Sequence, residues 1–210
     1  MGLTTEQKAF FSNAFSDFWP FIERFDFERE PIFHEMERDE QEHNVNIIGP
    51  WFGRLLNFLV RFGNVTSALE FGTATGYSAI WIAKGLPEGG LLTTIDCDRD
   101  RLQFAHENIA RAGLEDKITI REGDAQDIVS TLMEPFDFIF VDCAHLVALR
   151  SSERLLRKGG LFVCDNVGYR NKESFNDALT TCPYLQTLYL QCYLKSRAPE
   201  NTAVSISIRV

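Results

Sequence analysis

The sequence predicts an α/β fold, in which a mostly parallel sheet carries helices on both faces behind a helical N-terminal segment. From residue 65 onward, short apolar runs alternate with amphipathic helical patterns, which is typical of a parallel sheet with crossover helices. Residues 4–64 have helical periodicity instead. The last two apolar runs follow one another with no helix between them, so we expect them to pair antiparallel.

The chain of 210 residues fits one domain, which we divide into an N-terminal helical cap, 1–64, and an α/β core, 65–210. In the cap, Thr4 or Thr5 can begin a helix that ends at Phe18. A second helix is expected to start at Pro31, and a third to cover Trp51–Phe62.

The core elements follow from runs of apolar residues bounded by turn residues. Strands are predicted at Ala68–Phe71, Leu91–Ile95, Lys117–Glu122, Phe136–Val141, Leu161–Cys164, Gln186–Tyr193 and Ala203–Val210. Helices are predicted at Ser78–Lys84, Asp100–Ala112, Ala125–Met133, a segment ending with Ser151–Leu156, and Lys172–Leu179. Lys158-Gly-Gly160 is interpreted as a turn before the fifth strand.

The composition narrows the functional classes. The formal net charge of -9 argues against non-specific binding to nucleic acid or to anionic membranes. No apolar run approaches the roughly 20 residues of a membrane helix, and the polar start Met1–Lys8 does not resemble a signal peptide. The five cysteines include no Cys-x-x-Cys pair. We expect them to be buried or half-buried free thiols in a reducing compartment, which predicts a cytoplasmic protein.

In sheets of this kind, ligands bind beyond the carboxyl ends of the strands. The first core strand leads into Glu70-Phe-Gly-Thr-Ala-Thr-Gly-Tyr-Ser78, whose glycines allow a ligand to approach the backbone. An ordinary glycine turn is the alternative. The second strand ends at Asp96, which is placed to bind both hydroxyls of a ribose. A helix cap is the alternative there, although Asp98 and Asp100 are better placed to cap.

The third strand is followed by Gly123-Asp-Ala-Gln126, where a small residue leaves room for a flat ring and a polar neighbour can bind its edge. No cluster of cations that could hold a pyrophosphate follows the glycine loop. The three strand ends together favour a nucleoside without phosphates, a description that S-adenosylmethionine fits.

Carboxylates also follow the fourth and fifth strands. The fourth strand ends in Val141-Asp142, and the fifth ends in Cys164-Asp165-Asn166. Two carboxylates and a carboxamide form an all-oxygen ligand set that suits Mg²⁺, Mn²⁺ or Ca²⁺ rather than zinc. The alternative is that both aspartates only cap the segments that follow them.

Taken in order, these motifs resemble the cation-dependent O-methyltransferases, a family that includes the catechol and caffeoyl-CoA O-methyltransferases. The resemblance runs from about Pro31 to Val210. It implies a class I, Rossmann-like methyltransferase fold with a mostly parallel seven-stranded sheet and an antiparallel last strand. The motifs that carry it are Ala68–Ser78, Thr94–Asp96, Gly123–Ala125, Phe136–Asp142 and Lys158-Gly-Gly…Asp165-Asn-Val167.

The resemblance also implies roles for individual residues. Its cofactor is S-adenosylmethionine, with Asp96 on the ribose hydroxyls, Ala125 and Gln126 beside the adenine, and the backbone of Ile48 on the methionine moiety. The methionine half and the ribose side of the pocket would be lined by Glu70, Gly72, Thr73 and Ser78. A divalent cation, Mg²⁺ or possibly Mn²⁺ or Ca²⁺, would be bound by Asp142, Asp165 and Asn166.

One departure from the family concerns the catalytic base. The family commonly has Asp-x-x-Lys after the fourth strand, with the lysine as general base, whereas this chain has Asp142-Cys-Ala-His145. A free histidine titrates near pH ~6.5, so we predict that His145 removes the proton from the acceptor. The alternative is a polar loop histidine without a role.

We therefore predict an S-adenosylmethionine-dependent O-methyltransferase that acts on a small-molecule hydroxyl, with a catechol or another vicinal oxygen acceptor. A homodimer is expected from the family and from the aromatic N-terminal region. Two alternatives remain at this point. One is a methyltransferase acting on a uridine hydroxyl of tRNA, which the acidic composition weakens. The other is an S-adenosylmethionine-binding protein with impaired catalysis.

Overall fold

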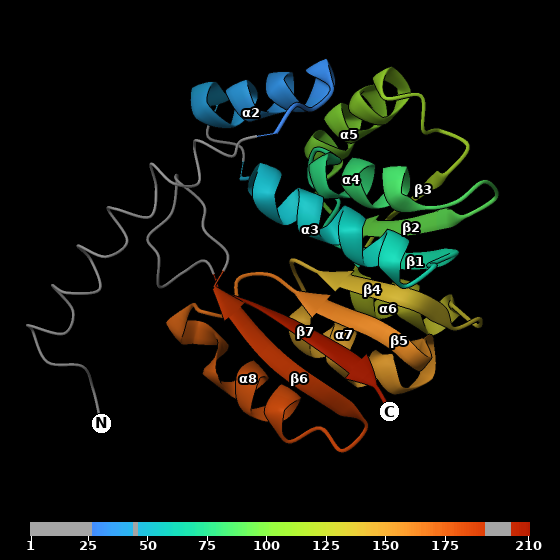
Figure 1. Ribbon diagram of the computed structural model, residues 1–210, viewed down its shortest axis with the longest axis vertical. Helices are drawn as coiled ribbons and strands as arrows, with labels where there is room; N and C mark the ends of the chain where they lie inside the picture. Colours follow the sequence, from blue (N-terminus) through green and yellow to red (C-terminus); the bar gives the residue numbers. More distant parts are fainter. Residues whose placement is uncertain (1–26, 44–45, 192–202) are drawn as a thin grey trace, which may run out of the picture.

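The computed structural model describes residues 27–43, 46–191 and 203–210. In these ranges, seven strands form one sheet in the order β3-β2-β1-β4-β5-β7-β6 (Figure 1). The first five strands are parallel, and β7 is antiparallel to both β5 and β6, as the sequence predicts. The strands are β1 Ser67–Phe71, β2 Leu91–Asp96, β3 Ile118–Glu122, β4 Phe136–Val141, β5 Leu156–Cys164, β6 Leu185–Gln191 and β7 Ala203–Arg209.

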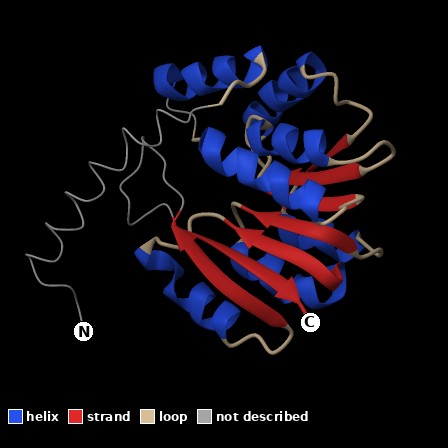
Figure 2. Ribbon diagram, viewed as in Figure 1, coloured by secondary structure: helices blue, strands red, loops and turns tan. Residues whose placement is uncertain are grey.

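Helices cover both faces of this sheet (Figure 2). Two separate apolar clusters form the core. In the first cluster, the four helices from α2 through α5 pack on one face of the sheet, with residues such as Phe33, Leu56 and Ile80. In the second cluster, the three helices from α6 through α8 pack on the opposite face, with residues such as Ile128 and Phe175. The helices are α2 Pro31–His43, α3 Gly49–Phe62, α4 Tyr77–Gly85, α5 Arg99–Arg111, α6 Ala125–Thr131, α7 His145–Leu155 and α8 Glu173–Thr180, with a short 3₁₀ helix η1 at Arg170–Lys172.

The cap helices are confirmed where the structure describes them. Helix α2 begins at Pro31 as predicted, and α3 begins two residues before the predicted Trp51, because Pro50 suits the first turn of a helix. The ring of Phe33 on α2 stacks on Trp81 of α4 at 4.1 Å between ring centroids. The helix predicted to end at Phe18 lies outside the described residues.

The junction of α7 and β5 differs from the sequence-based expectation. We predicted a turn at Lys158-Gly-Gly160, but α7 ends at Leu155 and β5 runs without interruption from Leu156. The register of β5 on β4 shifts between the pairs formed by Phe136 and Phe138. Gly159, with φ of 76°, takes the left-handed conformation inside this irregular segment, so the glycines form a bulge in the strand rather than a turn before it.

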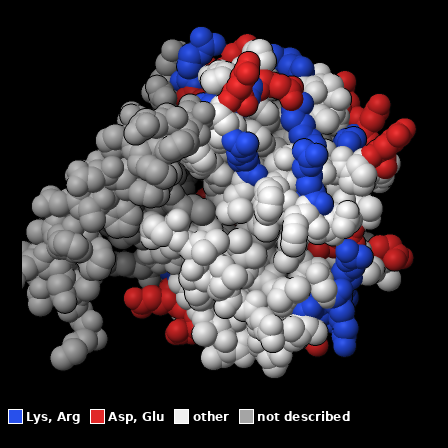
Figure 3. All heavy atoms as spheres, viewed as in Figure 1, with Lys and Arg blue, Asp and Glu red and all other residues white. Residues whose placement is uncertain are grey.

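One part of the sheet carries exposed apolar side chains. Leu188 and Leu190 of β6 and Ile208 of β7 share one sheet face, because Leu188 pairs with Ile206 and Gln186 pairs with Ile208. These three side chains, here called the β6–β7 patch, are 50%, 40% and 41% exposed. Figure 3 shows few charged residues on the molecular face over β5, β7 and β6. In the described ranges, no helix has the length and apolar character needed to cross a membrane.

Candidate active site

The carboxyl ends of four neighbouring strands form the candidate site. Strands β2, β1, β4 and β5 are adjacent in the sheet, and backbone hydrogen bonds join their ends. The N–H of Gly72 donates to the carbonyl of Ile95 at 2.9 Å, and that of Asp142 donates to Phe71 at 2.9 Å. The N–H of Asp165 donates to Val141 at 2.9 Å. The cofactor residues and metal ligands that are predicted at the ends of these four strands therefore lie together at the carboxyl end of the sheet.

The loop after β1 requires glycine at its first position. Gly72 has φ of 106°, and a Cβ atom there would lie 3.3 Å from Cβ of Asp142 and 3.4 Å from Sγ of Cys143. Gly76, with φ of 90°, precedes the first residue of α4. A side chain at position 72 would therefore push the end of β1 away from the end of β4.

Glu70 lies at the buried side of this loop. Its side chain is fully buried, and the hydroxyl of Thr94 donates to Oε2 at 2.5 Å. Thr73 joins the same chain, 2.7 Å from the hydroxyl of Thr94. Oε1 is buried and has no hydrogen-bond partner in the described part of the protein. Burial raises the pKa of Glu70 to about 8, and the charges of Asp142 and Asp96 add to this effect. A buried acceptor of this kind suits a cationic ligand.

Asp96 holds the glycine loop against the end of β2. Oδ2 accepts from the N–H of Ala74 at 2.8 Å, and Oδ1 accepts from the N–H of Asp98 at 3.0 Å. The cap of α5 is Asp98, whose carboxylate accepts from the N–H of Arg101 at 3.2 Å. The two aspartates thus have separate functions, as the sequence predicts for Asp98. The binding of ribose by Asp96 stays a prediction.

The other predicted cofactor residues belong to the helix starts that follow β3 and β1 and to the residue before α3. Ala125 and Gln126 form the first turn of α6, which Asp124 caps by accepting from the N–H of Gln126 at 2.8 Å. Ser78 is buried in the first turn of α4, and Ile48 is buried directly before α3. All of these residues lie at the start of a helix.

Asp142 and Asn166 contact one another across the ends of β4 and β5. Nδ2 of Asn166 donates to Oδ1 of Asp142 at 2.6 Å, and Asn166 takes a left-handed conformation with φ of 61°. Neither Asp142 nor Asp165 occupies an N-cap position, since the N-cap of α7 is Ala144 and that of η1 is Tyr169.

The donor chemistry of this trio fits a hard divalent cation, because carboxylate and carboxamide oxygens are the ligands such ions prefer. Asp165 is 4% exposed, and Asp142 is half-buried, so an ion could be held away from bulk solvent. No group of three or more His, Cys, Asp or Glu side chains within the described ranges is arranged to hold a metal. The expected set has only two such residues, so the metal site stays a prediction.

His145 lies at the first position of α7, rather than in a loop, and is only 4% exposed. Nε2 lies 2.8 Å from the carbonyl oxygen of Asp165, and Nδ1 lies 3.0 Å from Nζ of Lys172. The ring of Phe175 packs edge-on at 5.0 Å. The pKa of His145 is lowered to about 4, chiefly by burial, with the charge of Lys172 acting in the same direction. Both ring nitrogens have partners, and the role of His145 as a base stays a prediction.

Sequence reasoning missed Lys172. It lies in η1, 27 residues after His145, and neither its spacing nor its neighbours in the chain indicate contact with the site. Only the family's expectation of a lysine near the acceptor could have prompted a search for one.

The expectation for the cysteines is confirmed only in part. Cys97, Cys143, Cys164 and Cys182 are free thiols, and Cys192 lies outside the described residues. Cys164 is buried and Cys182 is half-buried, but Cys97 and Cys143 are exposed. The reason is their position directly after Asp96 and Asp142, where β2 and β4 have ended and the chain enters loops.

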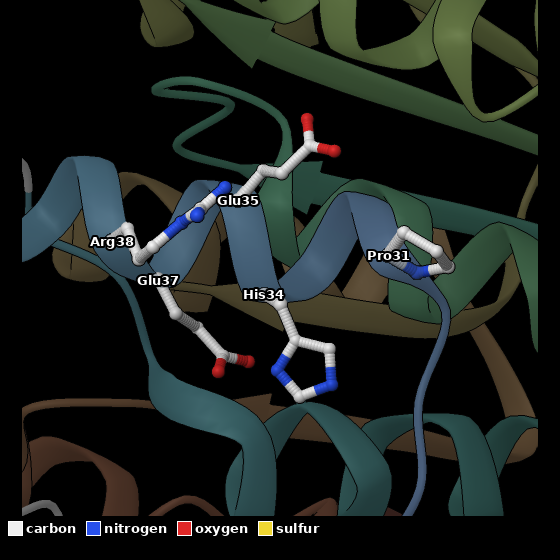
Figure 4. Close-up of a pocket in the computed structure, with 5 residues that line it drawn as sticks. All are labelled: Pro31, His34, Glu35, Glu37 and Arg38. Atoms are coloured by element: carbon white, nitrogen blue, oxygen red, sulfur yellow. The ribbon is translucent and has the colours of Figure 1, made fainter.

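A pocket of about 400 Å³ lies along α2. In Figure 4, the side chains of His34 and Glu37 point to one side of α2, and Glu35 points to the other. Glu37 accepts a hydrogen bond from the hydroxyl of Tyr77 at 2.7 Å and pairs with Arg29 at 2.6 Å. This contact joins the cap to the first residue of α4. The pocket is lined by Pro31, His34, Glu35, Glu37 and Arg38.

Comparison with known proteins gives consistent results. A catechol O-methyltransferase of Niastella koreensis is 39% identical over 127 residues, which is 57% of this chain and 58% of that protein. Caffeoyl-CoA O-methyltransferase 1 of Eucalyptus globulus is 37% identical over 122 residues, 54% of this chain and 50% of that protein. The chain thus spans about half the length of the curated relatives it matches.

Among solved structures, the O-methyltransferase from Bacillus cereus in complex with SAH superposes with a TM-score of 0.80 at 25% identity, over 91% of this chain and 96% of that chain. The O-methyltransferase family model matches residues 27–188, a range that contains all four strand ends of the site. From this match and from the fold, we conclude that the chain belongs to the O-methyltransferase family.

Proposed function

We propose that the chain transfers a methyl group from S-adenosylmethionine to a hydroxyl of a small molecule, with a catechol-like or other vicinal oxygen acceptor. The observation that carries the proposal is the convergence of acidic side chains from β1, β2, β4 and β5 at one edge of the sheet. Such an edge favours ligands that bring positive charge. S-adenosylmethionine has a sulfonium and an ammonium group, and a divalent cation adds charge on the acceptor side.

For the cofactor, the ends of β1 and β2 supply residues that would line one side of a binding pocket. Oε1 of Glu70, which has no hydrogen-bond partner among the described residues, can accept a hydrogen bond from the ammonium group of the methionine moiety. Gly72 opens the loop to the ligand, and the carboxylate of Asp96 is fixed by two backbone N–H groups and can accept from ribose hydroxyls. Ala125 and Gln126 would bound the adenine. SAH, bound in the Bacillus cereus structure, is this cofactor without its methyl group.

Methyl transfer from a sulfonium is a direct displacement. The acceptor oxygen forms a bond to the methyl carbon while the carbon–sulfur bond breaks, and the bonding pair stays on sulfur. The chain must therefore hold the oxygen in line with the methyl group, at about 3 Å. A divalent cation at Asp142, Asp165 and Asn166 would, when bound, acidify a coordinated hydroxyl. His145 is the sequence-based candidate for removing the proton.

The test of this function compares the wild type with Asp165→Ala. We expect methylation of a catechol to stop when a chelator is added and to return with Mg²⁺ or Mn²⁺. Asp165→Ala should abolish turnover and leave the affinity for S-adenosylmethionine nearly unchanged, because the ion lies on the acceptor side. Asp177→Ala, which removes an exposed carboxylate from α8, is the matched control and should retain activity.

If neither chelator nor Asp165→Ala changes the activity, the cation-dependent mechanism is rejected, but the assignment as a methyltransferase is retained. Methyl transfer to tRNA, with none to catechols, would favour the uridine-hydroxyl reaction instead. Binding of the cofactor without transfer to any acceptor would indicate a binding protein. The net charge of -9 supports a small-molecule acceptor over nucleic acid.

We further propose a cytoplasmic homodimer. The four described cysteines are free thiols, which supports a reducing compartment. The β6–β7 patch supports self-association, because an acidic chain repels a second copy least where its surface carries few charges.

A further inference from the structure

Lys172 is a half-buried cation whose polar contact, among the described residues, is with an imidazole rather than with an anion. Its Nζ lies 3.0 Å from Nδ1 of His145, and no ion pair joins it to another residue in the described part of the chain. Carboxylates that face a half-buried lysine usually neutralise it, because an unpaired charge loses solvation without compensation. Here the partner is an imidazole. An ammonium with this environment is suited to bind an anion that arrives with a ligand.

The contacts of His145 place this ammonium where β4 and β5 end. His145 is three residues beyond Asp142, at the first position of α7. Its Nε2 contacts the backbone oxygen of Asp165, the residue before Asn166. Lys172 reaches the other nitrogen of the same ring from η1. The imidazole of His145 thus separates the ammonium of Lys172 from the end of β5, where the proposed metal ligands Asp165 and Asn166 lie.

The hydrogen bonds also fix the form of the imidazole. A carbonyl oxygen can only accept, so Nε2 of His145 carries the hydrogen and donates it to Asp165. Nδ1 then has a lone pair and accepts from the ammonium of Lys172. Phe175 packs against the ring and restricts its rotation. His145 is therefore held as a neutral support for Lys172, which is a different function from the removal of a proton.

We propose that Lys172 is a catalytic residue whose ammonium stabilises the negative charge on the acceptor oxygen, and that His145 is the positioning residue that orients it. This inference rests on the proposed function. The acceptor hydroxyl releases its proton to solvent, and the oxyanion is held by the charge of Lys172. The oxyanion then forms its bond to the methyl carbon, the carbon–sulfur bond breaks, and its electron pair stays on sulfur.

The first experiment changes the charge at position 172 in the full-length protein. We expect Lys172→Met to lower kcat on a catechol by roughly 10²-fold, a loss typical of removing one group that stabilises an oxyanion. Lys172→Arg keeps the charge and should recover most of the rate. The affinity for S-adenosylmethionine should be the same in all variants. Lys158→Met, an exposed lysine near the opposite end of β5, is the control and should match the wild type.

A second experiment separates positioning from folding. Glutamine has an acceptor and a donor at a spacing similar to that of the imidazole nitrogens, so His145→Gln should keep much of the activity. His145→Leu should lose about as much as Lys172→Met. The combination of His145→Leu with Lys172→Met should cost little more than either change alone, because the two residues act as one unit. Additive losses would overturn the positioning role.

The third experiment reads the charge without turnover. 4-Nitrocatechol changes its absorbance when its hydroxyl ionises, so the pH of ionisation can be measured for the bound compound. Lys172→Met should raise that pH by about one unit or more, and Lys172→Arg should not. If the wild type methylates catechol and Lys172→Met changes neither kcat nor the ionisation of the bound probe, the inference is wrong and the proposed function stands. A wild type that neither binds nor methylates catechols overturns both.

Discussion

Glu70 shows how one residue can report on the cofactor. Its pKa of about 8 means that the side chain is mostly protonated at pH 7 when no cation lies near it. A cationic ligand favours the carboxylate and so lowers this pKa, and binding at pH 7 must release a proton. The affinity for the ligand should accordingly rise with pH until the pH exceeds about 8, and then level off.

We predict that binding of S-adenosylmethionine to the wild type releases a proton at pH 7 and that Glu70→Gln abolishes this release. Calorimetry in two buffers with different ionisation enthalpies measures the number of protons directly. Glu70→Gln should also weaken binding by about 1–3 kcal/mol, the value of a hydrogen bond to a charged group. Glu122→Gln, an exposed carboxylate at the end of β3, should change neither quantity. Proton release that persists in Glu70→Gln would contradict this assignment.

At the scale of elements, the site depends on how closely two strand ends approach. The loop between β1 and α4 passes the end of β4 at Gly72, where a side chain would meet Asp142 and Cys143. The sequence showed two glycines here but could not show what they approach, because β4 lies about 70 residues further along the chain. The same limit applies to the bulge at Gly159, which looked like a turn because the pairing of β5 with β4 was not known.

Gly72→Ala tests this approach. The positive φ alone should cost about 1–2 kcal/mol of stability, and the contact with Asp142 should also displace the predicted cofactor and metal residues. Gly89→Ala is the matched control, since Gly89 has φ of 75° but nothing lies within 4 Å of the added Cβ. Both variants should lose stability in denaturant titrations. Only Gly72→Ala should lose affinity for S-adenosylmethionine, and equal affinities would show that the close approach is unimportant for the cofactor.

For the whole molecule, the sequence was sufficient for the topology and for the positions of residues that follow strands. Alternating apolar and helical segments constrain parallel strands strongly, and Asp96, Asp142 and Asp165 are found at strand ends for that reason. The sequence was insufficient to predict contacts between residues that are far apart in the chain. The ring nitrogens of His145 contact the backbone oxygen of Asp165 and the ammonium of Lys172, which are 20 and 27 residues further along the chain. The ring also packs against Phe175. A local pattern contains none of this information.

The predicted homodimer concerns the surface of the whole molecule. The sheet ends at β6, whose outer edge has no neighbouring strand in the described structure, and the β6–β7 patch adjoins this edge. Two chains with a net charge of -9 repel one another over most of their surfaces. Contact through the patch would remove apolar area from water where that repulsion is weakest.

We therefore predict that the purified chain, with a mass of 24.0 kDa, sediments as a dimer at micromolar concentration. Leu188→Lys should shift it to the monomer, because the half-exposed side chain can change without opening the core while a charge is placed in the interface. Leu91→Lys, a similarly exposed position on β2, should stay dimeric. A monomeric wild type would contradict the dimer itself. A dimer that tolerates Leu188→Lys would instead move the interface away from β6, to another surface of the molecule.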